Sequence, residues 1–315
     1  MSMTVGAPAT RREAAQGSCA GFEVRSPLAF ATLRTGGGAP LAVEERSGLD
    51  PRGEVVATWQ PRPGNPFHGR LLTDGAGFAF WASDAGWYVI EPRQPSITVT
   101  AGVDPLRREL RLFGIPTAVC AFQMGDLPIH ASAVDVAGQG LLLAGPSMYG
   151  KTTLAAAFAA AGHRLLAEDT VRCTVEPIPS IYPGPAVVRL RADVARSLEV
   201  PGTTAAATPL EEGRTPLVFD AALRGSGAAV PLRAILFLRM QADRPVLEGL
   251  PSAEAARDLF ALAFRLPSDA SRAACFTRVV DLVSRVETLD LRRPMTVASL
   301  PDVVALVERH LAART

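Results

Sequence analysis

The stretch at residues 140–169, GLLLAGPSMYGKTTLAAAFAAAGHRLLAED, constrains the fold of this chain most. Its residues 145–152 match G-x-x-x-x-G-K-[ST], the phosphate-binding P-loop pattern. The apolar run at 141–144 predicts a buried strand, and the Ala-rich run at 154–161 predicts a helix. The alternative is an ordinary strand-turn-helix in which Gly-Lys-Thr occurs by chance. It is the weaker interpretation, because the segments on both sides of the loop match the strand and the helix that a P-loop needs. The stretch therefore predicts a glycine loop between a strand and a helix.

Each part of such a loop has a physical role in binding a polyphosphate. Backbone N–H groups of the loop and the positive end of the following helix face one phosphate cluster. Lys151 adds a point charge that reaches the β- and γ-phosphates, and the Thr152 hydroxyl is a ligand for Mg²⁺. ATP and Mg²⁺ are therefore the expected cofactors. The predicted nucleotide-binding residues are Gly145, Pro146, Ser147, Met148, Tyr149, Gly150, Lys151, Thr152 and Thr153.

Two adjacent acids, Glu168 and Asp169, end the strand predicted at 164–169. A P-loop site needs a carboxylate beside it to hold the metal, and activation of an acceptor hydroxyl needs a general base. Neighbouring residues on a strand point to opposite faces, so both acids reach one site only where the strand ends. The alternative interpretation is a solvated pair of acids in a turn.

Length and patterning predict two lobes, because 315 residues are many for one hydrophobic core. Residues 1–20 are small and polar, and we expect them to be disordered. Residues 21–125 contain short apolar or alternating segments separated by Gly, Pro and Asp, which predict a β-rich N-terminal lobe that ends in two short helices. Residues 126–315 hold the P-loop. The expected fold class is α+β or α/β, with the β-rich lobe before a nucleotide-binding core.

Composition and charge exclude several classes of protein. The formal net charge of +1 gives no global field that would attract nucleic acid or an anionic membrane. The N-terminal residues lack the apolar core of a signal peptide, and no apolar run is long enough to span a membrane. The four cysteines form no C-x-x-C and fit reduced, buried thiols. We expect a cytoplasmic protein with no nucleic-acid or membrane partner.

Three motifs resemble the C-terminal domain of HPr kinase/phosphorylase. Ile-His-Ala at 129–131 is similar to that family's strand with a site histidine, and the P-loop continues as Thr-Thr-Leu. Gly-His-Arg-Leu-Leu-Ala-Glu-Asp at 162–169 is similar to the family's G-H-R-L-x-A-D-D. With the Tyr-Pro-Gly-Pro turn at 182–185, the resemblance covers about residues 127–240. It is closest to the shorter HPr-kinase-like proteins of bacterial peptide-biosynthesis clusters.

The resemblance implies a phosphoenolpyruvate-carboxykinase-like core that acts as an ATP-dependent serine kinase. It gives Glu168 the place of the catalytic base and puts Asp169 on the metal side with Thr152, with the order of the two acids open. Lys151 would stabilise charge on the transferred group. His130 would lie near the phosphates or orient a carboxylate, and a satisfied core histidine is the alternative.

Two positions depart from the family pattern, and one clamp stays unassigned. Met148 stands where the family usually has Gly, and Glu168 stands where it has Asp. No segment matches the E-x-R-G of the bifunctional enzymes, so phosphorylase activity stays open. Arg189 or Arg224 is the candidate clamp for the transferred phosphoryl group.

The acceptor that the resemblance implies is a serine hydroxyl of a peptide or protein. Ribosomally made precursors, such as lasso peptides, belong to this class. Three alternatives stay open: a small-molecule kinase, a carboxykinase-like enzyme, and a non-catalytic nucleotide-binding regulator. A homo-oligomer also stays open.

Overall fold

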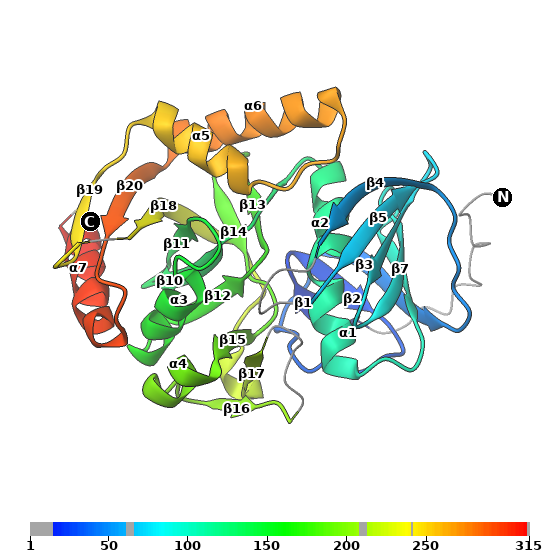
Figure 1. The fold of residues 1–315 in the computed structure, drawn as a ribbon, viewed down its shortest axis with the longest axis horizontal. Helices are drawn as coiled ribbons and strands as arrows, with labels where there is room; N and C mark the ends of the chain where they lie inside the picture. Colours follow the sequence, from blue (N-terminus) through cyan, green and yellow to red (C-terminus); the bar gives the residue numbers. More distant parts are fainter. Residues whose placement is uncertain (1–14, 61–65, 208–212, 241, 314–315) are drawn as a thin grey trace.

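The computed structural model describes residues 15–60, 66–207, 213–240 and 242–313. Within these ranges the fold is α+β, with two large sheets and helices between and around them (Figure 1). Among the described helices, none combines the length and the apolarity that crossing a membrane would need.

The first sheet lies in the N-terminal lobe and has the strand order β1-β2-β3-β8-β7-β6-β5-β4. Its strands are β1 (Ala15–Cys19), β2 (Phe22–Arg25), β3 (Ala39–Arg46), β4 (Glu54–Trp59), β5 (Gly69–Thr73), β6 (Phe78–Ala82), β7 (Gly86–Glu91) and β8 (Ser96–Thr100). The helices α1 (Pro105–Leu112) and α2 (Ile115–Gln123) follow it. The Asp104 side chain caps α1, and α1 and α2 meet at Gly114. This corner faces the second sheet.

The expectation of a disordered start is wrong for its last residues. Residues 1–14 lie outside the described residues, but residues 15–19 form β1 and pair with β2. Ser18 and Cys19 are fully buried, and the backbone of Ser18 exchanges two hydrogen bonds with Arg34. The run AQGSC has no apolar alternation, so only its pairing partners make it a strand.

The second sheet contains the P-loop strand and has the order β12-β10-β11-β18-β14-β13-β9, with β20 beside β18 and β19 beside β20. Its strands are β9 (Leu127–Ile129), β10 (Ser132–Val136), β11 (Gln139–Ala144), β12 (Arg164–Glu168), β13 (Val171–Thr174), β14 (Ser180–Tyr182), β18 (Val230–Arg239), β19 (Val246–Gly249) and β20 (Glu287–Arg292). Strands β11, β18 and β20 are parallel, so their carboxyl ends share one edge. β10 and β11 form an antiparallel hairpin that leads into the glycine loop.

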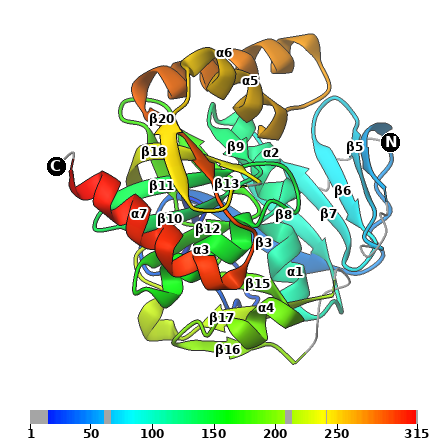
Figure 2. The same cartoon turned by 60° about the vertical axis from the view of Figure 1, so that its left-hand side comes forward.

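Helices cover both faces of the second sheet, as Figure 2 shows. The helices are α3 (Lys151–Ala160), α4 (Ala192–Ser197), α5 (Ser252–Leu262), α6 (Asp269–Arg285) and α7 (Leu300–Ala312), with short 3₁₀ turns at Ala221–Leu223 and Val297–Ser299. Leu141 and Leu143 of β11 face the cluster with α3 and α7, whereas Leu142 faces the cluster with α5 and α6. Burial on both faces explains why β11 is a continuous apolar run.

A third, small sheet lies beside the end of β12. It consists of β15 (Val187–Arg191), β17 (Arg214–Phe219) and β16 (Thr203–Ala205), with β17 in the middle. Its strands β15 and β17 carry Arg189 and Arg214, which face the acids at the end of β12.

The two lobes share one hydrophobic core and a set of buried hydrogen bonds. Residues of both large sheets belong to the same cluster of buried side chains. The Arg34 guanidinium is buried and donates to the carbonyl oxygens of Leu165 and Leu166 in β12, at 2.9 and 3.0 Å, and to that of Gly184 at 2.8 Å. The division at residues 125/126 stays a prediction, because the packing is continuous across it.

Candidate functional site

The glycine loop at residues 145–150 connects the carboxyl end of β11 to α3, in the strand-loop-helix order that the sequence predicted. Met148 and Gly150 adopt left-handed φ angles of 73° and 75°. The side chain of Met148 is 69% exposed and points away from the packed loop. Gly150, the N-cap of α3, has no side chain to satisfy the first-turn N–H groups. These free donors and the helix dipole make the loop suitable for an anion.

Lys151 is buried inside the loop rather than extended into solvent. Its Nζ donates to the carbonyl oxygens of Gly145 at 2.7 Å and Pro146 at 3.1 Å. Burial lowers the pKa of Lys151 to about 8, although the acids Asp169 and Glu168 oppose the shift. A bound phosphate would favour the ammonium form, so the residues present fit a polyphosphate.

Thr152, the next residue, connects the loop to the acids at the end of β12. Its Oγ1 donates to Oε1 of Glu168 at 3.1 Å. Oε2 of Glu168 accepts from the backbone N and from Nε of Arg189, both at 3.0 Å, and the Glu168 side chain is only 3% exposed. Nη1 of Arg214 lies 3.8 Å from Oε1. Glu168 is therefore held beside the predicted metal ligand.

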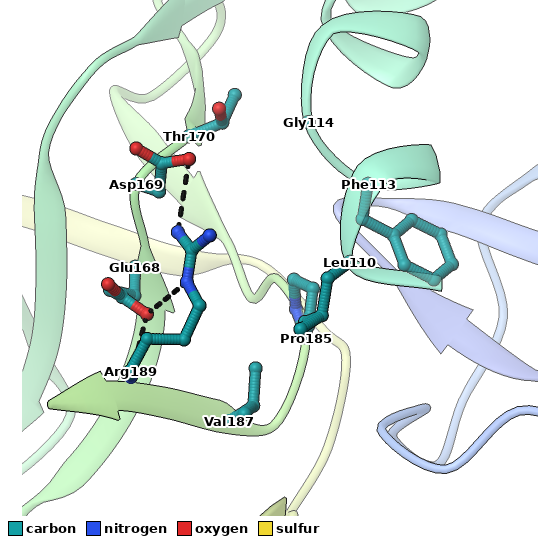
Figure 3. A pocket seen from close by; sticks show the side chains of 9 residues that line it. All are labelled: Leu110, Phe113, Gly114, Glu168, Asp169, Thr170, Pro185, Val187 and Arg189. Carbon is teal, nitrogen blue, oxygen red and sulfur yellow. Dashed lines mark hydrogen bonds and ion pairs between the residues drawn. The ribbon is translucent and has the colours of Figure 1, made fainter. Parts of the chain in front are cut away.

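Asp169 reaches the same site because the strand ends one residue earlier. Its φ of 72° is left-handed and turns the side chain away from the alternation of β12. Oδ2 lies 3.0 Å from Nη2 of Arg189, and Nδ1 of His130 lies 3.1 Å from Oδ1 and 2.9 Å from the Asp169 carbonyl oxygen. One arginine thus bridges both acids, as Figure 3 shows. The condition set by the sequence, that the strand must end there, is met.

The two acids differ in their access to solvent. The Asp169 side chain is 44% exposed, against 3% for Glu168. Desolvation opposes ionisation of Asp169, but Arg189 and His130 outweigh it and hold its pKa well below the usual range. Asp169 is therefore a carboxylate at neutral pH and faces the open side of the site.

A pocket opens in front of the two acids and is closed on its far side by the N-terminal lobe (Figure 3). Leu110, Phe113 and Gly114 come from the α1–α2 corner. The remaining lining residues come from the core: Glu168, Asp169, Thr170, Pro185, Val187 and Arg189. Both lobes therefore contribute to the lining of this pocket.

The structure brings the two acids to different partners, while their assignment to metal or base stays a prediction. The expectation paired Asp169 with Thr152 on the metal side, but the Thr152 hydroxyl bonds to Glu168. Asp169 bonds instead to His130 and Arg189. Packing of α3 against β12 decides this choice, and adjacent positions in a sequence cannot show it.

The two candidate arginines have different surroundings. Arg189 joins the site, whereas Arg224 donates from Nε to the Phe219 carbonyl oxygen at 3.0 Å and accepts from Arg34 through its own carbonyl. Arg214 contacts Glu168 and was not singled out from the sequence. It lies on β17, beside β15 in the third sheet, and no motif marks it.

A metal would need few protein ligands here. Within the described part of the chain, no three His, Cys, Asp or Glu side chains gather into a metal-binding cluster. A P-loop Mg²⁺ instead takes the threonine hydroxyl, a nearby carboxylate and phosphate oxygens. Thr152 and Glu168, joined by a hydrogen bond, are the two protein groups that would fit such a set.

Comparisons with known proteins give a distant likeness to solved structures. No protein-family model matches this chain, and no curated protein matches it. Among solved structures, the chain is similar to the HPr(Ser) kinase/phosphatase from Coxiella burnetii, with 12% sequence identity and a TM-score of 0.33. The match covers 60% of this chain and 99% of that chain. Both values are low, so the family stays a resemblance that rests on the sequence motifs.

Proposed function

We propose that this protein is an ATP-dependent phosphotransferase that moves the γ-phosphoryl group to a hydroxyl, most plainly a serine of a peptide or protein. The hydrogen bond from Thr152 to Glu168 carries the proposal. It joins the start of the P-loop helix to a pair of carboxylates, which are the two parts that phosphoryl transfer to a hydroxyl requires.

The glycine loop and Lys151 would bind the phosphates of the nucleotide. The N–H groups around Gly150 and the start of α3 face the phosphates, and the Lys151 ammonium balances their charge. Thr152 and Glu168 would hold Mg²⁺, which supplies charge neutralisation between the β- and γ-phosphates.

We assign proton transfer to Asp169. The geometry thus favours the reverse of the assignment that the resemblance implied, in which Glu168 was the base and Asp169 was on the metal side. A general base must reach the attacking hydroxyl. The oxygens of both acids have partners and both acids line the pocket, but the Asp169 side chain is 44% exposed whereas that of Glu168 is 3% exposed. Asp169 therefore takes the proton, and Glu168 stands on the metal side.

His130 and Arg189 orient the base rather than act on the acceptor. His130 holds Oδ1 of Asp169 and Arg189 holds Oδ2, so the carboxylate has a fixed direction toward the pocket. Holding a reacting group in a fixed direction lowers the activation free energy, because less freedom is lost on reaching the transition state. Arg189 also ties the base to the metal-side acid, Glu168.

The acceptor enters between the lobes. Apolar Leu110 and Phe113 and the backbone at Gly114 stand opposite Asp169 in the pocket. The pocket is small, so a short side chain with a terminal hydroxyl, such as a serine of a peptide, suits it better than a bulky alcohol would. A ribosomally made precursor peptide, such as a lasso-peptide precursor, is one acceptor of that class.

The test is a transfer assay with γ-labelled ATP and Mg²⁺. The acceptors are a pool of random peptides with one fixed serine, a matched pool with alanine, and a mixture of small alcohols and hydroxy acids. Label in the serine pool supports the proposal, and label only in the small molecules would show a small-molecule or carboxykinase-like enzyme. ATP binding without any transfer would show a regulator. Lys151→Met and Asp169→Asn are the controls that should lose transfer.

A further inference from the structure

Arg293, directly after β20, is a buried cation without an acidic partner. The residue is 2% exposed, and within the described part of the chain no carboxylate forms an ion pair with its guanidinium. Its Nε is buried and has no hydrogen-bond acceptor there. A buried charge is costly unless an opposite charge compensates it. Arg34 is also buried and forms no ion pair with a described residue, but each of its guanidinium nitrogens donates to a carbonyl oxygen. Arg293 differs because its Nε has no acceptor among the described residues, and an anion would compensate its charge.

Two of the three hydrogen bonds that the Arg293 side chain makes with described residues reach the glycine loop, although 143 residues separate it from Gly150, and the third goes from Nη1 to the adjacent Pro294 carbonyl oxygen at 3.3 Å. Its Nη2 donates to the carbonyl oxygens of Tyr149 at 3.2 Å and Gly150 at 3.4 Å. The same nitrogen would lie 2.4 Å from a Cβ at Gly150, so only glycine allows the guanidinium to sit this close.

These contacts fix the direction of two peptide groups of the loop: Arg293 holds the Tyr149 carbonyl, and it shares the Gly150 carbonyl with the backbone N–H of Leu154, which donates to it at 2.9 Å. In a planar trans peptide the C=O and the N–H point in opposite directions. Because the carbonyls of Tyr149 and Gly150 turn toward Arg293, the N–H groups of Gly150 and Lys151 turn away from it, into the loop. A cationic donor on the carbonyl also polarises the peptide and strengthens the donor at its other end.

We propose that Arg293 is a positioning residue of a polyphosphate site, which acts through the Tyr149 and Gly150 carbonyls and has the bound phosphates as its counter-ion. The inference rests on the proposed function, since it takes the loop to bind a nucleotide polyphosphate. It adds a residue that lies outside every motif of the chain.

The electrostatics of the loop agree with this assignment. Burial lowers the pKa of Arg293, and no neighbouring acid opposes that shift. Lys151 is also buried, with its ammonium group held by the carbonyl oxygens of Gly145 and Pro146. The loop without a ligand thus holds two desolvated cations. A bound polyphosphate would offset the cost of burying both positive charges. An arginine that only filled space or braced the loop would instead stabilise the protein without ligand.

The experiment compares Arg293→Met, Arg293→Lys and Arg292→Gln with the wild type. The probes are inorganic tripolyphosphate and ATP, titrated by calorimetry, beside thermal melts without ligand. Arg292 is the matched control, because it is the preceding residue, 52% exposed and paired with Asp290.

Arg293→Met should lower the affinity for both probes by about tenfold or more. Its melting temperature without ligand should stay equal to or above that of the wild type. Arg293→Lys should recover part of the affinity, and Arg292→Gln should bind like the wild type. Affinity of Arg293→Met within twofold of the wild type would overturn the inference, and so would a marked fall in its ligand-free stability. A wild-type protein that binds neither probe would contradict the proposed function itself, and this inference with it.

Discussion

The hydroxyl of Thr152 donates a 3.1 Å hydrogen bond to the carboxylate of Glu168, across 16 residues of sequence. The bond joins the first turn of α3 to the last residue of β12. It places a hydroxyl and a carboxylate, two oxygen ligands that Mg²⁺ accepts, side by side at the end of the glycine loop. Substitutions around this hydrogen bond can test which side chains bind the metal, take the proton or bind the phosphates.

Glu168→Gln should raise the Mg²⁺ concentration needed for ATP binding, because the amide is a weaker metal ligand than the carboxylate. Nε of Arg189 keeps an acceptor in the amide oxygen, so the fold should survive. The measurement is ATP affinity at several Mg²⁺ levels. Glu176→Gln, an exposed acid paired with Arg285, is the control. A Mg²⁺ titration that matches the wild type would remove Glu168 from the metal side.

Asp169→Asn should slow transfer by about 10²- to 10⁴-fold and leave ATP affinity nearly unchanged, as the loss of a general base does. The pKa of Asp169 lies well below its usual range, because Arg189 and His130 outweigh the desolvation that opposes ionisation. The transfer rate should therefore show no loss of activity from this group between pH 5 and 8. Single-turnover transfer to the serine pool is the measurement, and a mutant that keeps transfer but loses Mg²⁺ dependence would restore the original order of the acids.

ATP affinity should fall as the pH rises above about 8, because Lys151 loses its proton in that range. Burial lowers this pKa from 10.5, and bound phosphate raises it again, so binding takes up a proton between these limits. By the same linkage, Lys151 makes the ligand-free protein more stable as the pH rises through this window. Lys151→Met should bind more weakly and lose this pH dependence. An identical pH profile in that variant would assign the titration to another group.

Met148→Gly should keep ATP affinity, because the side chain is 69% exposed. Relief of the left-handed φ of 73°, about 1 kcal/mol, is partly offset by the larger chain entropy of glycine in the unfolded state. The free energy of unfolding should change by less than about 1 kcal/mol. Gly150→Ala, with a Cβ 2.4 Å from Nη2 of Arg293, should lose binding in the same titration. A large loss in Met148→Gly would place the thioether on the nucleotide.

Arg34→Met should reduce the free energy of unfolding by about 3 kcal/mol, because carbonyls of β12 and Gly184 lose a buried charged donor. Burial lowers the pKa of Arg34 to about 10, so the guanidinium is still charged at neutral pH. Urea unfolding is the measurement. Arg52→Met, which removes an exposed surface pair with Asp50, should change stability by less than about 1 kcal/mol. Equal stability of the two variants would show that Arg34 does not hold the lobes together.

Local features of this protein could be predicted from the sequence, because they depend on neighbouring residues. The strand, loop and helix around Gly150 follow from an apolar run, glycines and an Ala-rich run in succession. The same holds for the hairpin before the loop and for the break between α1 and α2 at Gly114. The contact of His130 with Asp169 was one of two alternatives that the sequence left open.

Pairing between distant segments could not be predicted, because it depends on packing that no local pattern encodes. β1 is a strand only because β2 and the backbone of Arg34 pair with it. The α1–α2 corner faces Asp169 only because the two lobes pack together.

The sequence by itself determined which residues make up the candidate site: a glycine loop, a lysine, a threonine and two adjacent acids, all within 30 residues. Only the tertiary structure decided how they are used. The packing of α3 on β12 selected Glu168 as the partner of Thr152, and the left-handed backbone of Asp169 turned the second acid toward His130. Arg189 on β15 and Arg293 directly after β20 reach the site from distant parts of the chain. Their contacts depend on position in the folded structure and not on position in the sequence.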